Sequence, residues 1–217
     1  MDPSARRPRL EAARLYVVTG ARVDQGDLVE FLAAILGAGV DVIQLREKEA
    51  EAGDLLRWGE VFREAADRHG ALFTVNDRPD VALALGADGV HVGQNDLAPS
   101  AVRPIVGTEC VVGVSTHTID QIDAAVLEPV DYVAVGPVFG TSTKRSAYEA
   151  VGLERVRDAA RKAHARGLPI VAIGGITLDR AEDVIGAGAA SVAVISDLLT
   201  GGNPEVRVRD FVRRLGA

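Results

Sequence analysis

The chain has 217 residues, 47% of them hydrophobic and only 4% aromatic, with a net charge of −7 and a pI of about 5.1. This composition suits one globular domain with an aliphatic core, and the acidic charge argues against a nucleic-acid partner, which needs a basic face. Residues 1–13 lack the apolar stretch of a secretory signal, and no run of about 18 apolar residues predicts a membrane span. We therefore expect a flexible segment over 1–13, a folded domain over 14–217 and a cytoplasmic location.

Short apolar runs alternate with longer amphipathic stretches. The runs are nearly continuous in Val, Ile and Leu, which is typical of strands buried on both faces in a parallel sheet. The predicted strands are 15–19, 42–45, 72–75, 89–92, 111–114, 132–135, 170–173 and 191–195. Apolar spacing and capping residues predict helices over 27–36, 54–69, 98–106, 119–127, 153–165, 179–185 and 204–215, with another beginning near Pro79.

A weak internal repeat favours a closed barrel. The stretches GAGVDVIQL, LGADGVHVG, EPVDYVAVG and GAGAASVAVI each combine a helix-ending turn, a small or acidic residue and a β-branched strand. They form every second run, and this recurrence predicts an α/β fold with a single-domain (β/α)8 TIM barrel. A doubly wound open sheet is the alternative, but it concentrates ligand contacts at one switch point, whereas polar residues here follow most of the runs.

The single cysteine, Cys110, begins one of these runs. One thiol cannot form an internal disulfide, which favours a reducing compartment. We expect this residue to be a small core side chain rather than a reactive group.

Cations follow two of the predicted strands. Arg46 and Lys48 come directly after the second strand, and Lys144 lies in the longest irregular stretch, residues 136–152. Converging cations predict a polyphosphate site, and a loop of this length is often a lid. For Arg46 and Lys48 alone, a solvated charged turn is the alternative.

Two aspartates follow neighbouring strands. Asp77 comes after Asn76 at the end of the third strand, and Asp96 follows the fourth. Two carboxylates at adjacent strand ends suit Mg²⁺, which takes few protein ligands together with waters and substrate phosphates. Either aspartate could instead cap the helix that follows it.

A monophosphate site is indicated after the last two strands. Gly174 and Gly175 close the seventh run, and Ile195 and Ser196 close the eighth, which is the usual phosphate position in these barrels. The sequence has no HExxH, no CxxC pair and no nucleophile elbow.

Two histidines lie close to these polar strand ends. His91 falls within the fourth strand, and we expect it to be a core or rim residue. His117 follows Ser115 and could act as a base or cap the next helix.

Together, the segments QLREK, VNDR, HVGQNDL, GVSTH, GPVFGTSTK, AIGGIT and VAVIS closely resemble the thiamine phosphate synthase family, from about Leu15 to the C-terminal helix. The resemblance implies a transferase (EC 2.5.1.3) of thiamine biosynthesis. Such an enzyme joins 4-amino-2-methyl-5-(diphosphomethyl)pyrimidine to a thiazole (carboxy)ethyl phosphate, by dissociative, Mg²⁺-assisted loss of diphosphate, and gives thiamine phosphate. It implies small-molecule substrates and no nucleic-acid or membrane partner. A homodimer is plausible from its frequency among soluble proteins.

The resemblance also implies roles for single residues. Contacts with the pyrimidine diphosphate are expected from Gln44, Leu45, Arg46, Glu47, Lys48, Asn76, Ser115 and Lys144. Contacts with the thiazole phosphate are expected from Thr141, Ser142, Thr143, Gly175, Ile195 and Ser196. The implied catalytic residues are Arg46, Lys48, Ser115 and Lys144, and the implied ligands of one Mg²⁺ are Asp77 and Asp96.

Two departures from the family pattern and two rival functions remain. Gly20 stands where the family often has an aspartate, and SAYEA within the long loop is less typical. A thiazole tautomerase would use His117 as a proton shuttle but would not need the cations together with both aspartates. A non-catalytic phosphate-ligand sensor would leave the paired carboxylates unexplained.

Overall fold

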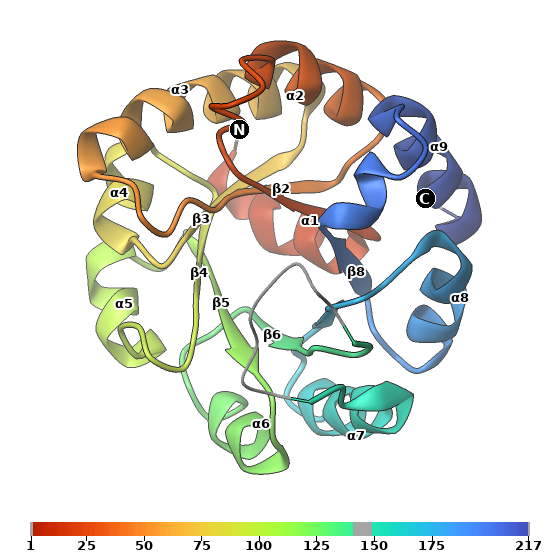
Figure 1. Cartoon of the computed structure of the whole chain (residues 1–217). Coiled ribbons are helices and arrows are strands. Elements are labelled where there is room, and N and C mark those ends of the chain that lie inside the picture. Colours follow the sequence, from red (N-terminus) through yellow and green to blue (C-terminus); the bar gives the residue numbers. More distant parts are fainter. Residues whose placement is uncertain (1, 141–148, 217) are drawn as a thin grey trace.

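Eight parallel strands close into a barrel in chain order in the computed structural model, which describes residues 2–140 and 149–216 (Figure 1). The strands are β1 (Leu15–Thr19), β2 (Val42–Leu45), β3 (Leu72–Asn76), β4 (Gly89–Val92), β5 (Val111–Thr116), β6 (Tyr132–Val135), β7 (Ile170–Ile173) and β8 (Ser191–Val194). The predicted barrel is confirmed. It could be predicted because strands that are buried on both faces appear in the sequence as continuous apolar runs.

A helix follows each strand, and these helices form an outer ring around the barrel (Figure 1). They are α2 (Leu28–Gly37), α3 (Ala52–His69), α4 (Pro79–Ala84), α5 (Pro99–Val106), α6 (Ile119–Ala125), α7 (Gly152–His164), α8 (Leu178–Gly186) and α9 (Pro204–Leu215), and the short 3-10 helix η2 (Ser196–Leu199) follows β8. Local sequence fixes several ends. At α6, for example, Thr118 accepts a hydrogen bond from the Gln121 N–H in a complete capping box.

Apolar side chains fill two separate regions. One lies between the strands and the outer helices and includes Ile43, Phe73 and Val90, while the other fills the barrel interior with residues such as Val18 and Val171. Cys110 is buried, and burial raises the pKa of its thiol to about 11. Its thiol therefore stays protonated at neutral pH, as expected of a core residue.

The acidic residues of the internal repeat tie the barrel strands together at their amino ends. Each aspartate precedes an even-numbered strand and accepts a hydrogen bond from a backbone N–H at the start of the odd-numbered strand before it. The pairs are Asp41 with Leu15 (2.9 Å), Asp88 with Phe73 (2.9 Å) and Asp131 with Val112 (2.8 Å). Before β8 the position is held by Ala190, whose carbonyl accepts from Arg14 instead (3.0 Å). The repeat thus reflects one hydrogen-bonding arrangement, from an aspartate to the backbone of the preceding strand, that recurs before β2, β4 and β6.

A helix precedes β1 in place of the flexible segment expected over residues 1–13. After a 3-10 turn (Pro3–Ala5), α1 (Arg6–Ala12) closes the far end of the barrel in Figure 1, with Leu10 only 2% exposed. Arg6 pairs with Asp88 (3.0 Å) and Arg7 pairs with Asp131. The expectation was wrong because these partners lie about 80 and 120 residues away, where no local sequence pattern reveals them.

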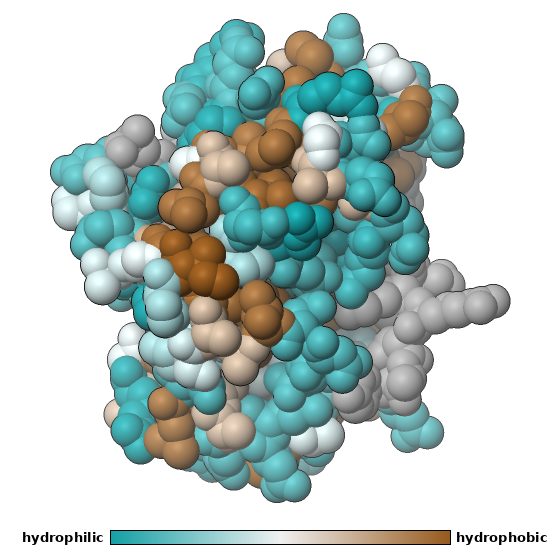
Figure 2. Space-filling model, turned by 90° about the vertical axis from the view of Figure 1, so that its left-hand side faces the viewer, coloured by the Kyte–Doolittle hydropathy of each residue, from teal (hydrophilic) through white to brown (hydrophobic). Residues whose placement is uncertain are grey.

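Apolar side chains also gather on the outer face that carries α3, α4 and α5 (Figure 2). They include Leu83 of α4 and Ile105 of α5, which are 58% and 40% exposed. Within the described part of the chain, no helix combines the length and the apolar character needed to cross a membrane. The homodimer suggested by base rates stays a prediction.

Candidate active site

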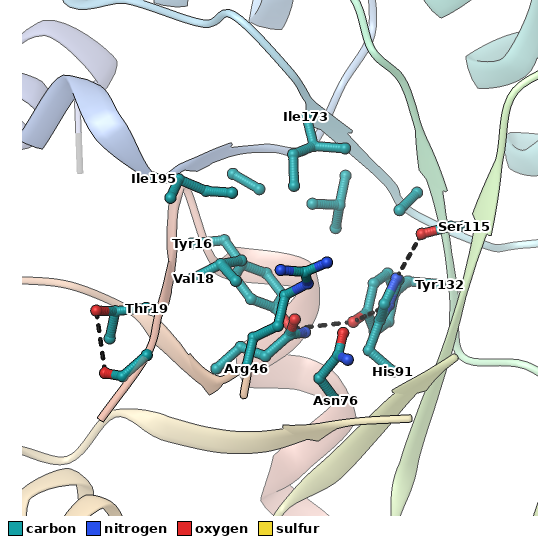
Figure 3. Close-up of a pocket in the computed structure, with 15 residues that line it drawn as sticks. Tyr16, Val18, Thr19, Arg46, Asn76, His91, Ser115, Tyr132, Ile173 and Ile195 are labelled. Atoms are coloured by element: carbon teal, nitrogen blue, oxygen red, sulfur yellow. Dashed lines mark hydrogen bonds between the residues drawn. The ribbon is translucent and has the colours of Figure 1, made fainter. Parts of the chain in front are cut away.

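A cavity opens among the carboxyl ends of the strands, where the polar strand ends were expected to meet (Figure 3). Its volume is about 120 Å³, and its wall includes Gln44, Arg46, Asn76 and Ser115. These residues come from β2, the turn after it, β3 and β5. The barrel therefore brings together residues that are up to 179 positions apart in sequence, since the same wall also includes Tyr16 and Ile195.

Arg46 and Asn76 project into this cavity (Figure 3). The backbone N–H of Arg46 donates to the Thr19 carbonyl (2.9 Å), which holds the turn after β2 against β1. The guanidinium group brings positive charge to the cavity, and the Asn76 amide adds both a donor and an acceptor.

Two of the residues expected to contact a pyrimidine diphosphate turn elsewhere. Leu45 points to the outer core and is 1% exposed, because successive strand residues face opposite sides. The Glu47 carboxylate accepts a hydrogen bond from the Ala21 N–H (2.7 Å). A Cβ atom on Gly20 would lie 2.3 Å from that carboxylate oxygen, so Gly20 is what allows Glu47 to hold the loop after β1.

Asp77 and Asp96 lie side by side at the rim. Lys48 pairs with Asp77 (Nζ to Oδ2, 3.1 Å), and Asp96 accepts from the Gly93 N–H (2.8 Å). The pKa of the Asp96 carboxyl is raised, first by burial and then by the neighbouring Asp77 carboxylate. Neither aspartate caps the following helix, since α4 and α5 begin without a side-chain cap.

The donor set of this carboxylate pair fits Mg²⁺. Two adjacent carboxylates raise each other's energy unless a cation lies beside them, and Lys48 supplies a single charge. Among the described residues, no cluster of three or more His, Cys, Asp or Glu side chains could hold a metal. A pair with room for waters and phosphate oxygens matches the preference of Mg²⁺ rather than that of a structural zinc. Asp77 also adopts a left-handed backbone conformation, with φ of 63°.

A chain of hydrogen-bonded polar side chains lies at the wall of the cavity, and Figure 3 shows its members Tyr16, Tyr132, His91 and Ser115. Its hydrogen bonds join Gln44 Nε2 to Tyr16 OH (2.7 Å), Tyr16 OH to Thr74 Oγ1 (2.8 Å) and to Tyr132 OH (3.1 Å), Tyr132 OH to His91 Nδ1 (2.8 Å), and His91 Nε2 to Ser115 Oγ (2.8 Å). Burial raises the pKa of both tyrosines, so each remains a neutral hydroxyl.

Sequence reasoning did not identify Tyr16 or Tyr132 as members of this hydrogen-bonded network. The available signal was Gly113, a glycine inside a buried strand, which marks a close approach by another group. A Cβ atom there would lie 2.0 Å from Cζ of Tyr132. The tyrosine ring occupies the space that a side chain on β5 would need, and His91 stacks on it with ring centroids 5.5 Å apart.

A second cavity, of about 340 Å³, adjoins the first and shares Ser115 with it. Its wall includes Gly174, Gly175, Ile195 and Ser196, the turns expected to bind a monophosphate. Gly174 and Gly175 have φ of 102° and 63°. Cβ atoms on them would lie 2.5 Å from Pro137 Cα and from the Gly140 carbonyl oxygen, so the loop after β6 requires glycine at both positions.

His117 also lines the second cavity. Its Nδ1–H donates to the Gly136 carbonyl, and its backbone N–H donates to the Gln121 side chain (2.7 Å). Thr118 rather than His117 caps α6, so the capping alternative for this histidine is wrong. A role as a base stays a prediction.

Four expected site residues, Thr141, Ser142, Thr143 and Lys144, lie outside the described residues. The chain on either side of them is bonded into the cavity wall. Phe139 N–H donates to the Gly174 carbonyl (2.9 Å), and Val151 N–H donates to the Pro137 carbonyl (2.8 Å).

Comparisons with known proteins point to one family. The family model described as thiamine monophosphate synthase matches residues 15–198. A thiamine-phosphate synthase from Acidothermus cellulolyticus is 48% identical over 209 residues, covering 96% of this chain and 97% of that protein. Another from Saccharopolyspora erythraea is 46% identical, with coverage of 100% and 99%. The solved structure of a thiamine phosphate pyrophosphorylase from Pyrococcus furiosus has a TM-score of 0.85 at 30% identity, covering 96% of this chain and 98% of that one.

Proposed function

The chain belongs to the thiamine monophosphate synthase family, and from that membership we propose how its rim carries out the reaction. The substrates are 4-amino-2-methyl-5-(diphosphomethyl)pyrimidine and a thiazole phosphate, and the products are thiamine phosphate and diphosphate. The observation that carries this proposal is the pair of adjoining cavities, which share Ser115, Ile173, Ala193 and Ile195 in their walls. A rim with cations and carboxylates borders the first cavity, and a glycine turn lines the second. Two phosphorylated substrates require two such sites.

The first cavity binds the pyrimidine diphosphate in this proposal. Arg46 and Lys48 attract the diphosphate, and the Asn76 amide contributes a further hydrogen bond. Asp77 and Asp96 would hold Mg²⁺, which supplies positive charge against the charge that develops on the departing diphosphate. Lys144, expected from the family resemblance, would add to the same side.

The second cavity positions the acceptor. Backbone N–H groups at Gly175 and Ser196 bind the thiazole phosphate, with Thr141 to Thr143 expected nearby. The bond from the pyrimidine-methyl carbon to the diphosphate oxygen breaks with its electron pair on the oxygen. The thiazole nitrogen then forms the new carbon–nitrogen bond with its own lone pair, and no proton needs to move. The protein's task is therefore charge stabilisation and placement rather than general base catalysis.

The direct test mixes the purified protein with Mg²⁺ and both substrates and measures thiamine phosphate and diphosphate. We expect equal amounts of the two products, and we expect their formation to stop when EDTA is added and to resume with excess Mg²⁺. Stabilisation by the substrates without any product would instead indicate a phosphate-ligand sensor. Product formation that EDTA leaves unchanged would refute the role of the ion.

A further inference from the structure

The hydrogen-bonded chain below the first cavity can carry its protons in two opposite orders, and a contact at one end favours one of them. Thr74 Oγ1 donates to the Ile43 carbonyl (3.4 Å), and a carbonyl oxygen can only accept. The Thr74 hydroxyl has a single proton, so in the order that keeps this bond to Ile43 the Tyr16 hydroxyl donates to Thr74 (2.8 Å). Gln44 Nε2 can only donate to Tyr16, which is consistent with this order.

The same limit of one proton per hydroxyl applies to the next contacts toward the cavity. Tyr16 has used its only proton, so Tyr132 must donate to Tyr16 across the 3.1 Å contact. Tyr132 then has none left for His91, and the 2.8 Å contact between them requires a proton on His91 Nδ1. In an uncharged imidazole Nε2 is then an acceptor, so the Ser115 hydroxyl donates to it (2.8 Å).

The consequence appears at the cavity wall. In this proton order Ser115 directs its proton toward His91, so the part of its oxygen that faces the cavity carries lone pairs. A hydroxyl fixed in this way accepts a hydrogen bond from a ligand and cannot donate one. The stacked rings of His91 and Tyr132, 24° from parallel, keep the imidazole in the orientation that this requires.

We propose that Tyr132 and His91 are positioning residues that turn the Ser115 hydroxyl into an obligate acceptor, and that Ser115 thereby selects a heteroaromatic ligand bearing an N–H donor. This step rests on the proposed function for its ligand. Of the groups on that pyrimidine ring, only the exocyclic amino group can donate a hydrogen bond, because both ring nitrogens are acceptors. The enzyme then distinguishes an aminopyrimidine from one that lacks the amino group, through a preset proton rather than through shape.

The proton order can be measured without any ligand. Nitrogen-15 NMR at pH 8 distinguishes Nδ1–H from Nε2–H imidazoles, and the chain has only 4 histidines, so the signal that disappears in His91→Asn identifies this residue. We expect the Nδ1–H form in the wild-type protein. Tyr132→Phe keeps the ring but removes the hydroxyl, and it should shift the population toward Nε2–H. An Nε2–H imidazole in the wild-type protein overturns the proposal.

The ligand preference is tested by binding. The probes are two 2-methyl-5-(phosphooxymethyl)pyrimidines, one with the 4-amino group and one without it. Each carries a single phosphate and therefore has no diphosphate to lose. We expect the wild-type protein to prefer the amino compound by about tenfold, the value of one neutral hydrogen bond, and Tyr132→Phe to lose most of that preference. Thr116→Val is the matched control, because it removes an equally buried hydroxyl from the next residue of β5, bonded to the Ala134 carbonyl (2.9 Å).

The outcomes separate the two claims. A preference that survives in Tyr132→Phe, or one that Thr116→Val abolishes equally, refutes the positioning role. If neither compound binds the wild-type protein, the pyrimidine has been assigned to the wrong cavity and the proposed ligand of Ser115 is wrong with it. The NMR result still decides the proton order in that case.

Discussion

Asp77 and Asp96 share one point of the rim, with the Lys48 ammonium beside Asp77. Each carboxylate is held by a different contact, and the two come from the loops after neighbouring strands. Their closeness makes the pair unfavourable by itself and favourable around a divalent ion. Substitution of Asp77 tests the role of the pair in holding the ion, and substitution of Asp96 tests the cost of the pair to stability.

Asp77→Asn should reduce turnover by 10²–10⁴, on the order of 3–5 kcal/mol, if charge stabilisation of the leaving group dominates. The measurement is the rate of diphosphate release at saturating substrates across a range of Mg²⁺ concentrations. Asp80→Asn is the control, since Asp80 lies nearby on α4 and pairs with Arg78 at the surface. A rate for Asp77→Asn equal to that of the control would show that Asp77 holds no ion.

Asp96→Asn should stabilise the metal-free protein at neutral pH while it lowers activity. The pKa of Asp96 is raised in the folded state, so ionisation costs more there than in the unfolded chain. The gain in unfolding free energy should therefore be present above the folded-state pKa. It should vanish as the pH falls below the unfolded-state value, because the wild-type carboxyl is then protonated in both states.

The expected size of this gain is a few tenths of a kcal/mol, because solvent screens a partly exposed pair. Urea unfolding with EDTA present, at pH 7 and again near pH 3, measures it. A gain of the same size at both pH values would trace the effect to something other than carboxylate ionisation.

Residue positions were easier to predict from sequence than side-chain directions. Asp77, Asp96 and Arg46 follow strands, and strand ends of a barrel meet at one rim whatever the details of packing. Glu47 has the same kind of position, yet its carboxylate turns to the Ala21 N–H because Gly20 leaves space. Such a choice depends on a contact across strands, which a linear pattern does not contain.

At the scale of elements, β5 depends on its central glycine. Gly113→Ala would place a methyl group 2.0 Å from Tyr132 Cζ, so the ring must move and its hydroxyl must leave His91 or Tyr16. We expect a loss of about 1–3 kcal/mol in unfolding free energy, the usual cost of overpacking a core. Denaturant unfolding measures the loss.

A double substitution shows whether the ring is the cause. Tyr132→Leu should cost stability by itself, but it should remove most of the additional cost of Gly113→Ala, so that the two effects are less than additive. Strict additivity would mean that the methyl group meets something other than the tyrosine ring.

Element boundaries followed from sequence wherever a local cause sets them. The runs that became β2, β4 and β6 have the predicted limits, because each lies between a turn and a buried apolar core. Helix α1 was missed because its stability comes from distant partners. Tertiary contacts of this kind override weak local propensity.

At the scale of the whole molecule, the two ends of the barrel have different tasks. The rim carries the unfavourable carboxylate pair, whereas the opposite end satisfies its buried aspartates with arginines and backbone N–H groups. Asp88, 1% exposed as a side chain, meets both Arg6 and Arg63 (3.0 and 2.7 Å). The favourable contacts at one end help to offset the strain at the other.

Deletion of residues 1–12 should lower the free energy of unfolding by about 3–5 kcal/mol, because it removes the buried Leu10 and one partner of Asp88. Affinity for the substrates should change little in the fraction that remains folded, since the rim lies at the other end. Thermal unfolding and calorimetric binding measure the two quantities. Glu11→Ala, at an exposed position of α1, is the control, and a deletion no more harmful than this substitution would deny α1 a structural role.

The left-handed backbone at Asp77 narrows what can replace it. Asparagine and glycine tolerate that conformation, whereas other side chains add roughly 1–2 kcal/mol of local conformational energy. An inactive Asp77→Glu enzyme would therefore be ambiguous, because the longer acid disturbs the loop before it reaches any ion. The amide is the cleanest probe of this position, since it changes the charge and leaves the chain path intact.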